Sequence, residues 1–226
     1  MKQPLTLRIK RTGRPGAAGE KPGGWQDFQV QISERAYLLD ALEEAWRQDP
    51  TLLFRHACHH ASCGSCGLRV NGRERLACVT PALEAARRGV VRLEPLRNFP
   101  VVADLVVDFS PLAQKLESVQ ACVVTGAAGA RQFSRCIECG LCVSACPISA
   151  LNPRYLGPAA LAAAAGRLDV PAVRAGVEDA DGLWRCHGAY DCTDVCPVGV
   201  DPALGIGRLR QALILPNFKR KAKPSD

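Results

Sequence analysis

Residues 136–147 read CIECGLCVSACP, and residues 186–197 read CHGAYDCTDVCP. In the first stretch the cysteines are followed by Pro147 and stand at four positions: Cys136, Cys139, Cys142 and Cys146. The second stretch repeats the spacing and ends on Pro197, but Ala189 stands where the second cysteine is expected. The two stretches are therefore copies of one pattern, C-x2-C-x2-C-x3-C-P, and the second copy lacks one sulfur.

This spacing is that of bacterial ferredoxins that bind two iron–sulfur clusters, in which the fourth cysteine of each run ligates the other cluster. The rule gives one complete set of four thiolates, suited to [4Fe–4S]: Cys136, Cys139, Cys142 and Cys196. It also gives a set of three: Cys146, Cys186 and Cys192. Because Ala189 offers no ligand, we expect the second site to hold [3Fe–4S], a cubane that lacks one corner.

A different cysteine spacing occurs upstream in CHHASCGSCGLRVNGRERLAC, residues 58–78. The C-x4-C-x2-C…C order is typical of a plant-type [2Fe–2S] ferredoxin. Its four predicted ligands are Cys58, Cys63, Cys66 and Cys78. Asn71-Gly72 predicts a hairpin turn that returns the chain toward Cys78. Of the twelve cysteines only Cys122 is then left over, and we expect it to be a small apolar residue that binds no iron.

Other uses of so many cysteines are less consistent with the sequence. A disulfide framework belongs to small secreted domains, and the beginning of the chain, MKQPLTLRIK, lacks the apolar core of a secretory signal. Structural zinc generally takes two C-x2-C pairs per ion, and a redox dithiol needs a single C-x-x-C. His59 and His60 flank Cys58, but four cysteines already complete that site, so we do not expect a histidine ligand there.

The composition is that of an ordinary globular protein. The chain has 226 residues, 47% of them apolar, and a formal net charge of +7. No stretch approaches 18 consecutive apolar residues, so we expect no membrane span. Lys and Arg are scattered and no nucleic-acid-binding motif occurs, so nucleic acid is not an expected partner. The basic tail at 217–224 is either solvated or lies against an anionic membrane surface.

The N-terminal half predicts an α+β arrangement. Apolar residues alternate with polar ones over 5–9 and 28–32, which indicates two strands, and recur at helical spacing over 38–46. Ser33 is a candidate cap for that helix, and further strands are expected at 68–70 and 90–93. This is the order of a β-grasp ferredoxin domain, which we assign to residues 1–105. Residues 95–109 are expected to connect the two halves.

The C-terminal half, residues 106–226, predicts an all-α domain with the two cysteine runs of a bacterial-type two-cluster ferredoxin. Helices are expected at 111–119, at 159–167 after Pro158, and at 203–214 after Asp201 as a cap. The fold class is therefore α+β, with a plant-type ferredoxin domain followed by a helical ferredoxin domain.

The chain resembles the iron–sulfur subunit of succinate dehydrogenase and fumarate reductase over nearly its whole length. Besides the cysteines, three stretches carry the resemblance: CGSCGLRVNG (63–72), EPLRNFPVVADLVVD (94–108) and LNPRYLGPAAL (151–161). The resemblance implies an electron-transfer subunit that is not catalytic alone. A partner flavoprotein with FAD would interconvert succinate and fumarate, and a membrane anchor would present quinone. It also implies a peripheral position on the cytoplasmic face of the inner membrane.

The resemblance suggests His187 and Pro147 as residues of the quinone pocket. The chain departs from the family directly after Pro147, where many relatives carry tryptophans and this chain has residues 148–151, ISAL. Two rival functions remain open at this stage. One is the same electron-transfer role in a soluble thiol-dependent fumarate reductase or a heterodisulfide reductase-like complex, for which we expect a further cysteine-rich catalytic domain. The other is a free multi-cluster ferredoxin carrier.

Overall fold

The structure is a computed structural model, and it describes residues 1–12, 23–119, 133, 135–165, 167–168 and 171–221, with side chains as far as 214. The chain divides into two compact units. The first comprises Met1–Phe109 together with Ile137–Ala145, and the second comprises Ser110–Cys136 and Cys146–Asp226. The first unit therefore includes a short segment from the middle of the first cysteine run. Cys122 lies outside the described residues.

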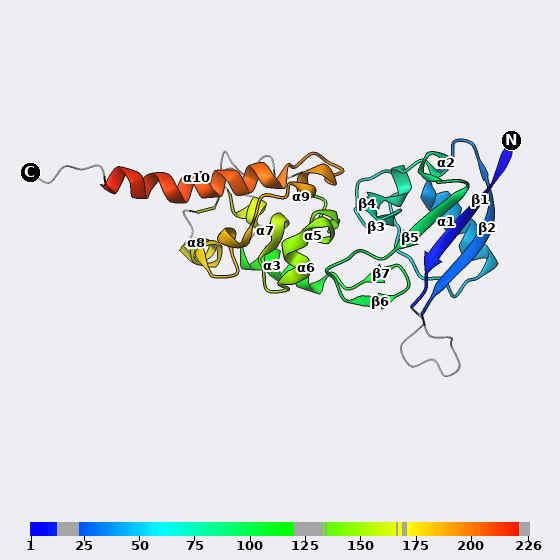
Figure 1. Cartoon of the computed structure of the whole chain (residues 1–226), viewed down its shortest axis with the longest axis horizontal. Coiled ribbons are helices and arrows are strands. Elements are labelled where there is room, and N and C mark those ends of the chain that lie inside the picture. Colours follow the sequence, from blue (N-terminus) through cyan, green and yellow to red (C-terminus); the bar gives the residue numbers. More distant parts are fainter. Residues whose placement is uncertain (13–22, 120–132, 134, 166, 169–170, 222–226) are drawn as a thin grey trace, which may run out of the picture. The chain divides into compact units, whose positions relative to one another are not determined.

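A mixed five-stranded sheet forms the first unit, in the order β2-β1-β5-β3-β4. The long strands β1 (Lys2–Lys10) and β2 (Trp25–Ser33) pair antiparallel along their whole length, and β5 (Val90–Glu94) joins β1 in parallel (Figure 1). Strands β3 (Gly67–Val70) and β4 (Arg73–Leu76) form the predicted hairpin. Its turn places Asn71 and Gly72 at positive φ, as a two-residue hairpin turn requires.

Helix α1 (Leu38–Gln48) packs against β2 with one apolar face. Its Leu38, Leu39 and Leu42 are at most 2% exposed, as are the inward-facing Leu5, Leu7 and Ile9 of β1, so these residues form the core of the unit. The prediction that Ser33 caps the helix was wrong. Ser33 ends β2, and the helix begins after Tyr37, whose backbone N–H donates to the carboxylate of Asp40 at 2.7 Å.

Short elements complete the first unit. They are η1 (Ala77–Val79), α2 (Ala82–Ala85), β6 (Val101–Ala103), β7 (Val106–Val107) and α5 (Leu141–Ala145). The segment expected to be a connector at 95–109 thus carries a strand pair and belongs to the first unit. Helix α5 is held on β4 by the buried Glu74, which accepts a hydrogen bond from the Ser144 hydroxyl at 2.9 Å.

The second unit is helical in its described residues. Its elements are α3 (Ser110–Ser118), α6 (Pro147–Leu151), α7 (Gly157–Ala164), α8 (Pro171–Glu178), η2 (Leu183–Arg185), α9 (Asp191–Asp194) and α10 (Pro202–Lys221). Helix α7 is buried along its whole length and contacts α3, α8 and α10. Gly205 of α10 lies against Ala162, and an added Cβ there would come within 2.9 Å of the Ala162 Cα. The small residues of both helices therefore permit a close approach.

The helix caps in this unit follow the sequence prediction. The carboxylate of Asp201 accepts a hydrogen bond from the Leu204 N–H at 3.0 Å, at the start of α10. Pro158 occupies the first turn of α7. The α+β fold class predicted from the sequence is confirmed.

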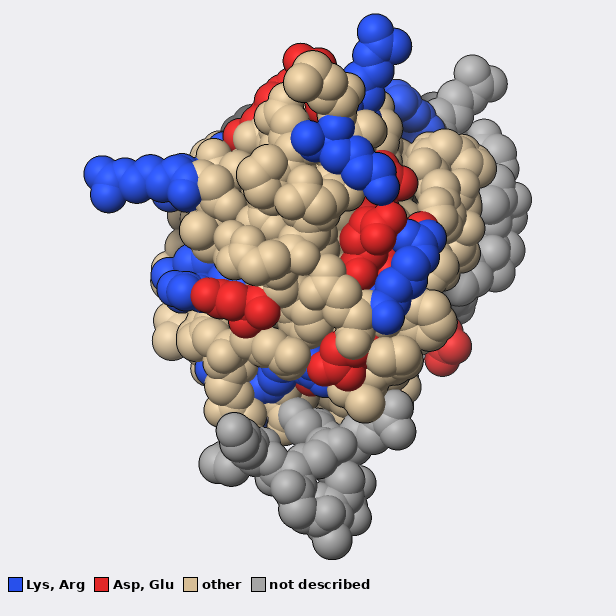
Figure 2. Space-filling view, turned by 90° about the vertical axis from the view of Figure 1, so that its right-hand side faces the viewer, with Lys and Arg blue, Asp and Glu red and all other residues tan. Residues whose placement is uncertain are grey.

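Charged side chains are dispersed over the first unit. Figure 2 shows Lys and Arg interspersed with Asp and Glu on the face that it presents, rather than gathered into one basic surface. Some of these charges form ion pairs. Arg8 of β1 pairs with Asp27 of β2 at 2.7 Å, and Arg47 pairs with Glu44 on α1 at 2.6 Å. Within the described part of the chain, no helix is both long enough and apolar enough to cross a bilayer.

Candidate metal centres

The first cysteine set lies in the loop before β3 and in η1, which follows β4. Backbone N–H groups point at its sulfurs. Ser62 and Cys63 both donate to Cys58 Sγ at 3.3 Å, and Ala61 donates to Cys78 Sγ at the same distance. The N–H of Cys78 in turn donates to Cys66 Sγ at 3.5 Å. Hydrogen bonds to sulfur of this kind are what an iron–sulfur site uses to favour thiolates over thiols.

The thiols of this loop differ in their ease of ionisation. The N–H of His60, helped by those of Cys63 and Ser62, lowers the pKa of Cys58 to about 7. Burial raises the pKa of Cys66 to about 12, and the neighbouring Cys78 side chain contributes to that rise. A buried thiolate without a cation is unfavourable, so Cys66 and Cys78 are suited to a bound metal that compensates the charge.

Neither histidine beside Cys58 is aimed at the sulfurs. The His60 ring bonds the carbonyl oxygen of Cys58, whereas Nε2 of the His59 ring lies 3.1 Å from Nδ1 of the His56 ring. The loop also shows why Gly64 is needed, because it has φ +70° and an added Cβ would come 2.7 Å from the Cβ of Cys139. The first loop and the Cys139 segment are therefore in direct contact inside the first unit.

The three-cysteine set lies at one pocket of the second unit. Cys146, Cys186 and Cys192 line an empty space of about 570 Å³ that is open to solvent, and Ala189 lines the same space. Burial, together with the charges of Cys146 and Cys186, raises the pKa of Cys192 to about 11. Three thiols that share one pocket, with an alanine methyl as their neighbour, match the ligand shortage read from the sequence.

Two further residues line the pocket, and the spacing of the cysteines did not reveal them. Tyr155 is 1% exposed, and its pKa is raised by burial and by the thiols of Cys186 and Cys146. Arg210 of α10 also lines the pocket and donates to the carbonyl of Cys186. Tyr155 stands within the LNPRYLGPAAL stretch that carries the family resemblance. No motif in the sequence singled out Arg210.

His187 and Pro147 both line this pocket, beside the cysteines that precede them in the chain. Lys115 of α3 lies near the same group of thiols. Its Nζ donates to the carbonyl of Pro153 at 2.7 Å. Burial lowers the pKa of Lys115, while the charge of Cys146 raises it, so a cation stands within electrostatic reach of one of the three sulfurs.

The four cysteines predicted for [4Fe–4S] come from both units. Cys139 and Cys142 belong to the first unit, whereas Cys136 and Cys196 belong to the second. One sulfur of the set, Cys196 Sγ, accepts the N–H of Val200 at 3.3 Å. The set stays a prediction.

The donor atoms fit the clusters that the spacing predicts. Thiolates grouped in a loop or a pocket, with backbone N–H groups on several sulfurs, are the ligands and the hydrogen bonds of iron–sulfur proteins. These residues could therefore hold clusters that move electrons.

Comparison with known proteins gives two family matches that together span most of the chain. Residues 6–114 match the family model of the 2Fe-2S iron-sulfur cluster binding domain. Residues 132–200 match that of the 4Fe-4S dicluster domain.

Individual relatives cover both regions. The chain is 40% identical over 215 residues to the fumarate reductase iron-sulfur subunit of Mycobacterium tuberculosis, which covers 82% of this chain and 84% of that protein. It is 34% identical to the succinate dehydrogenase iron-sulfur subunit of Paracoccus denitrificans, over 78% of this chain and 76% of that one. A chain of the Mycobacterium smegmatis Sdh1 complex, solved in its apo form, aligns over 100% of both chains with a TM-score of 0.78 and 26% identity.

Proposed function

This chain belongs to the family of iron–sulfur subunits of succinate dehydrogenase and fumarate reductase, and we propose that it relays electrons between the FAD of a partner flavoprotein and a quinone held at a membrane anchor. Iron–sulfur clusters supply the chemistry, because they accept and release single electrons. The chain's own residues hold the clusters and set their surroundings. The flavoprotein, rather than this chain, converts succinate and fumarate.

The pocket of three thiols carries the proposal, because it combines the ligands of one cluster with the residues suggested for quinone. Cys146, Cys186 and Cys192 would hold [3Fe–4S], and His187 and Pro147 line the same open space. A quinone that entered this space would meet the terminal cluster directly. Upstream in the relay, the loop of Cys58 would hold [2Fe–2S], and the set of Cys136 would hold [4Fe–4S].

Attachment to the membrane would run through partner subunits on the cytoplasmic face. Exposed apolar side chains support a docking surface on the second unit. Leu151 is 83% exposed, Tyr190 64% and Trp184 52%. Leu151 ends the helix that begins at Pro147, and Tyr190 lines the pocket itself. A large apolar side chain exposed at the pocket, as Tyr190 is, favours a protein or membrane contact there.

The relatives favour this function over the two rivals. The two sequence relatives are iron–sulfur subunits of the reductase and the dehydrogenase by name, rather than a free multi-cluster carrier or part of a thiol-dependent reductase. A free carrier would also purify as a stable monomer, whereas we expect this chain to purify with a flavoprotein.

The test separates the relay from the quinone end. We expect the complex purified with this chain to pass electrons from succinate both to quinone and to an artificial acceptor that draws from the flavin. His187→Ala should lower quinone reduction at least about tenfold, the effect of losing one positioned polar contact, and leave the artificial acceptor reaction intact. Arg174→Ala removes a half-exposed side chain of α8 that does not line the pocket, so it is the control and should change neither rate. Absence of a flavoprotein from the purified material would contradict the relay, and equal loss of both activities would contradict the pocket.

A further inference from the structure

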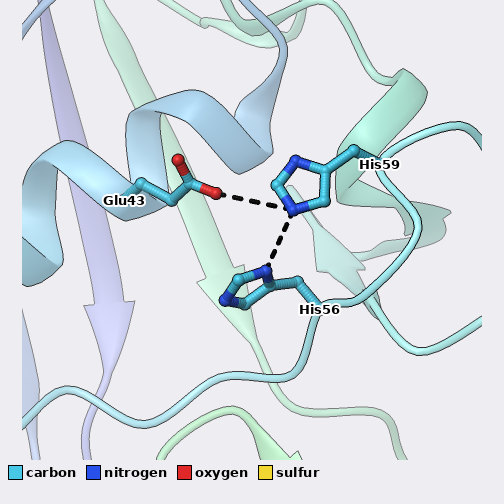
Figure 3. Close-up of side chains that lie close together, drawn as sticks. All are labelled: Glu43, His56 and His59. Atoms are coloured by element: carbon cyan, nitrogen blue, oxygen red, sulfur yellow. Dashed lines mark hydrogen bonds and ion pairs between the residues drawn. The ribbon is translucent and has the colours of Figure 1, made fainter.

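Three potential metal ligands meet on the first unit, outside the cysteine sets. Glu43 projects from α1, and His56 and His59 come from the segment that contains Cys58 (Figure 3). His56 Nδ1 lies 3.1 Å from His59 Nε2, and that nitrogen lies 3.8 Å from a carboxylate oxygen of Glu43. One ligand atom from each residue lies within 4.8 Å of the other two. We propose that these three residues bind one divalent cation of the zinc class.

The spacing of the ligand atoms suits such an ion. Zinc binds nitrogen at about 2.0–2.1 Å in tetrahedral geometry, which requires about 3.4 Å between two ligand nitrogens. The two imidazole nitrogens are only a few tenths of an ångström closer than that. The carboxylate is slightly farther, and Glu43 can adjust because its side chain is 30% exposed. Two imidazoles and a carboxylate are the ligand set of open zinc sites, where water takes the fourth position.

The two histidine side chains are held in place independently of an ion. The His56 ring stacks on Phe54, with ring centroids 5.3 Å apart, and the His59 ring meets His56 edge-on at 5.2 Å. His59 has φ +63°, a left-handed conformation that is unfavourable for a non-glycine residue. Surrounding contacts must therefore fix this backbone, and the result is that the imidazole faces α1.

The nearby cation on α1 does not compete for Glu43. Arg47 is paired with the neighbouring Glu44 at 2.6 Å. The carboxylate of Glu43 is therefore available to His59, and one of the two imidazoles must present a lone pair to the other. A cation bound by Glu43, His56 and His59 replaces the hydrogen bond between the two imidazoles with three metal–ligand bonds. His59 is 46% exposed, so an ion and its water ligand can enter from solvent.

The site is separate from the cluster ligands, although it shares their loop. Cys58 lies between the two histidines in sequence, but its sulfur is engaged by the N–H groups of Ser62 and Cys63. His60 is directed to the carbonyl of Cys58 and takes no part in the group. A bound cation would tie this loop to α1, so we also expect it to slow the loss of iron from the first cluster.

The test measures zinc on the full-length chain without an affinity tag, with its clusters loaded under anaerobic conditions. After equilibrium dialysis against Zn²⁺, we expect one zinc per chain in addition to the iron. Glu43→Gln, His56→Ala and His59→Ala should each weaken zinc binding at least about tenfold, as the loss of a ligand does. His60→Ala and His187→Ala are the matched controls and should bind zinc as the unchanged chain does.

Two readouts keep the result decisive. Zinc X-ray absorption should show a shell of nitrogen and oxygen with imidazole scattering, whereas sulfur in the shell would place the ion on cluster cysteines and overturn the proposal. The spectrum of the reduced [2Fe–2S] cluster shows whether a variant is intact. If His59→Ala loses iron, its zinc binding no longer tests the site. Zinc binding by Glu43→Gln then decides, because Glu43 lies on α1 and not in the cluster loop. Unchanged zinc binding in Glu43→Gln, or an equal loss in His60→Ala, would also overturn the proposal.

Discussion

Ala189 differs from a cysteine by one sulfur atom. The absence of that atom is the reason that the terminal cluster is predicted to hold three irons rather than four. The methyl group lies in the pocket of Cys146, Cys186 and Cys192. We expect Ala189→Cys to permit [4Fe–4S] assembly there. The added thiolate brings negative charge and so lowers the reduction potential, and quinone reduction should slow. Electron paramagnetic resonance should show the oxidised three-iron signal in the unchanged protein and its loss in the variant.

Ala189→Val is the control for this prediction, since it adds bulk but no ligand and should keep the three-iron signal. If the unchanged protein has no such signal, a non-cysteine group holds a fourth iron, and the deduction from the missing sulfur is wrong.

Lys115 gives a second prediction at the scale of one residue. It places a cation near Cys146, fixed by the carbonyl of Pro153 at 2.7 Å. A positive charge favours the reduced, more negative cluster, so Lys115→Gln should lower the potential of the three-iron centre. Lys115→Arg keeps the positive charge, so its three-iron centre should have nearly the reduction potential of the unchanged protein. A redox titration of the three-iron signal measures both, and identical potentials in all three proteins would refute the electrostatic role.

Single residues also mark where sequence reasoning was sufficient and where it was not. The cysteines could be grouped from their spacing, because ligands close in sequence constrain one another. Tyr155 and Arg210 line the same pocket but come from other elements with no repeated pattern. Glu43 likewise meets His56 and His59 only through the packing of α1, so no spacing could have revealed that group.

At the scale of elements, the loop of the first cysteine set is shaped by the segment that packs on it. Gly64 has φ +70°, and an added Cβ would come 2.7 Å from the Cβ of Cys139. Gly89 has a similar φ of +77° with nothing within 4 Å. Both positions cost an alanine about 1 kcal/mol of backbone strain, but only Gly64→Ala adds a clash.

We therefore expect Gly64→Ala to lose a large share of its iron, while Gly89→Ala keeps nearly all of it. Iron per chain and the [2Fe–2S] spectrum measured on both variants decide the point. Equal iron in the two variants would show that the contact with Cys139 does not matter for cluster retention.

Elements with a clear periodicity were predicted correctly, and polar or short elements were missed. Strands β1 and β2 and helix α1 lie where the apolar pattern placed them, and β3, β5 and α3 lie within a residue of the predicted ranges. Helices α7 and α10 begin where Pro158 and Asp201 indicated, although α7 ends at Ala164 rather than at 167. Strand β4, which the Asn71-Gly72 turn implied but no apolar pattern marked, reads RERL. One of its two buried positions is the charged Glu74, whose partner Ser144 lies 70 positions away in sequence. Only the cap of α1 was misassigned, because Tyr37 has no capping side-chain oxygen of the usual type, and Asp40 supplies the bond instead.

At the scale of the whole molecule, the three cysteine sets fix the amount of iron. Clusters of two, four and three irons sum to about nine Fe per chain, and zinc should be low in a preparation not exposed to it. Elemental analysis of oxygen-protected protein checks the total. Cys122→Ser should leave it unchanged, because eleven other cysteines account for the sites. Four irons or fewer in folded protein would contradict the three-cluster arrangement.

The first unit is not a continuous piece of the chain. Its main part ends at Phe109, yet Ile137–Ala145 also belongs to it. That late segment supplies Ser144, the hydrogen-bond partner of the buried Glu74. On the ribosome, the emerging N-terminal part therefore cannot complete its packing until Ala145 has been synthesised. At 5–20 residues per second the wait after Phe109 is roughly 2 to 7 seconds. During translation the first cluster loop stays uncovered for that interval, open to whatever delivers iron and sulfide to it.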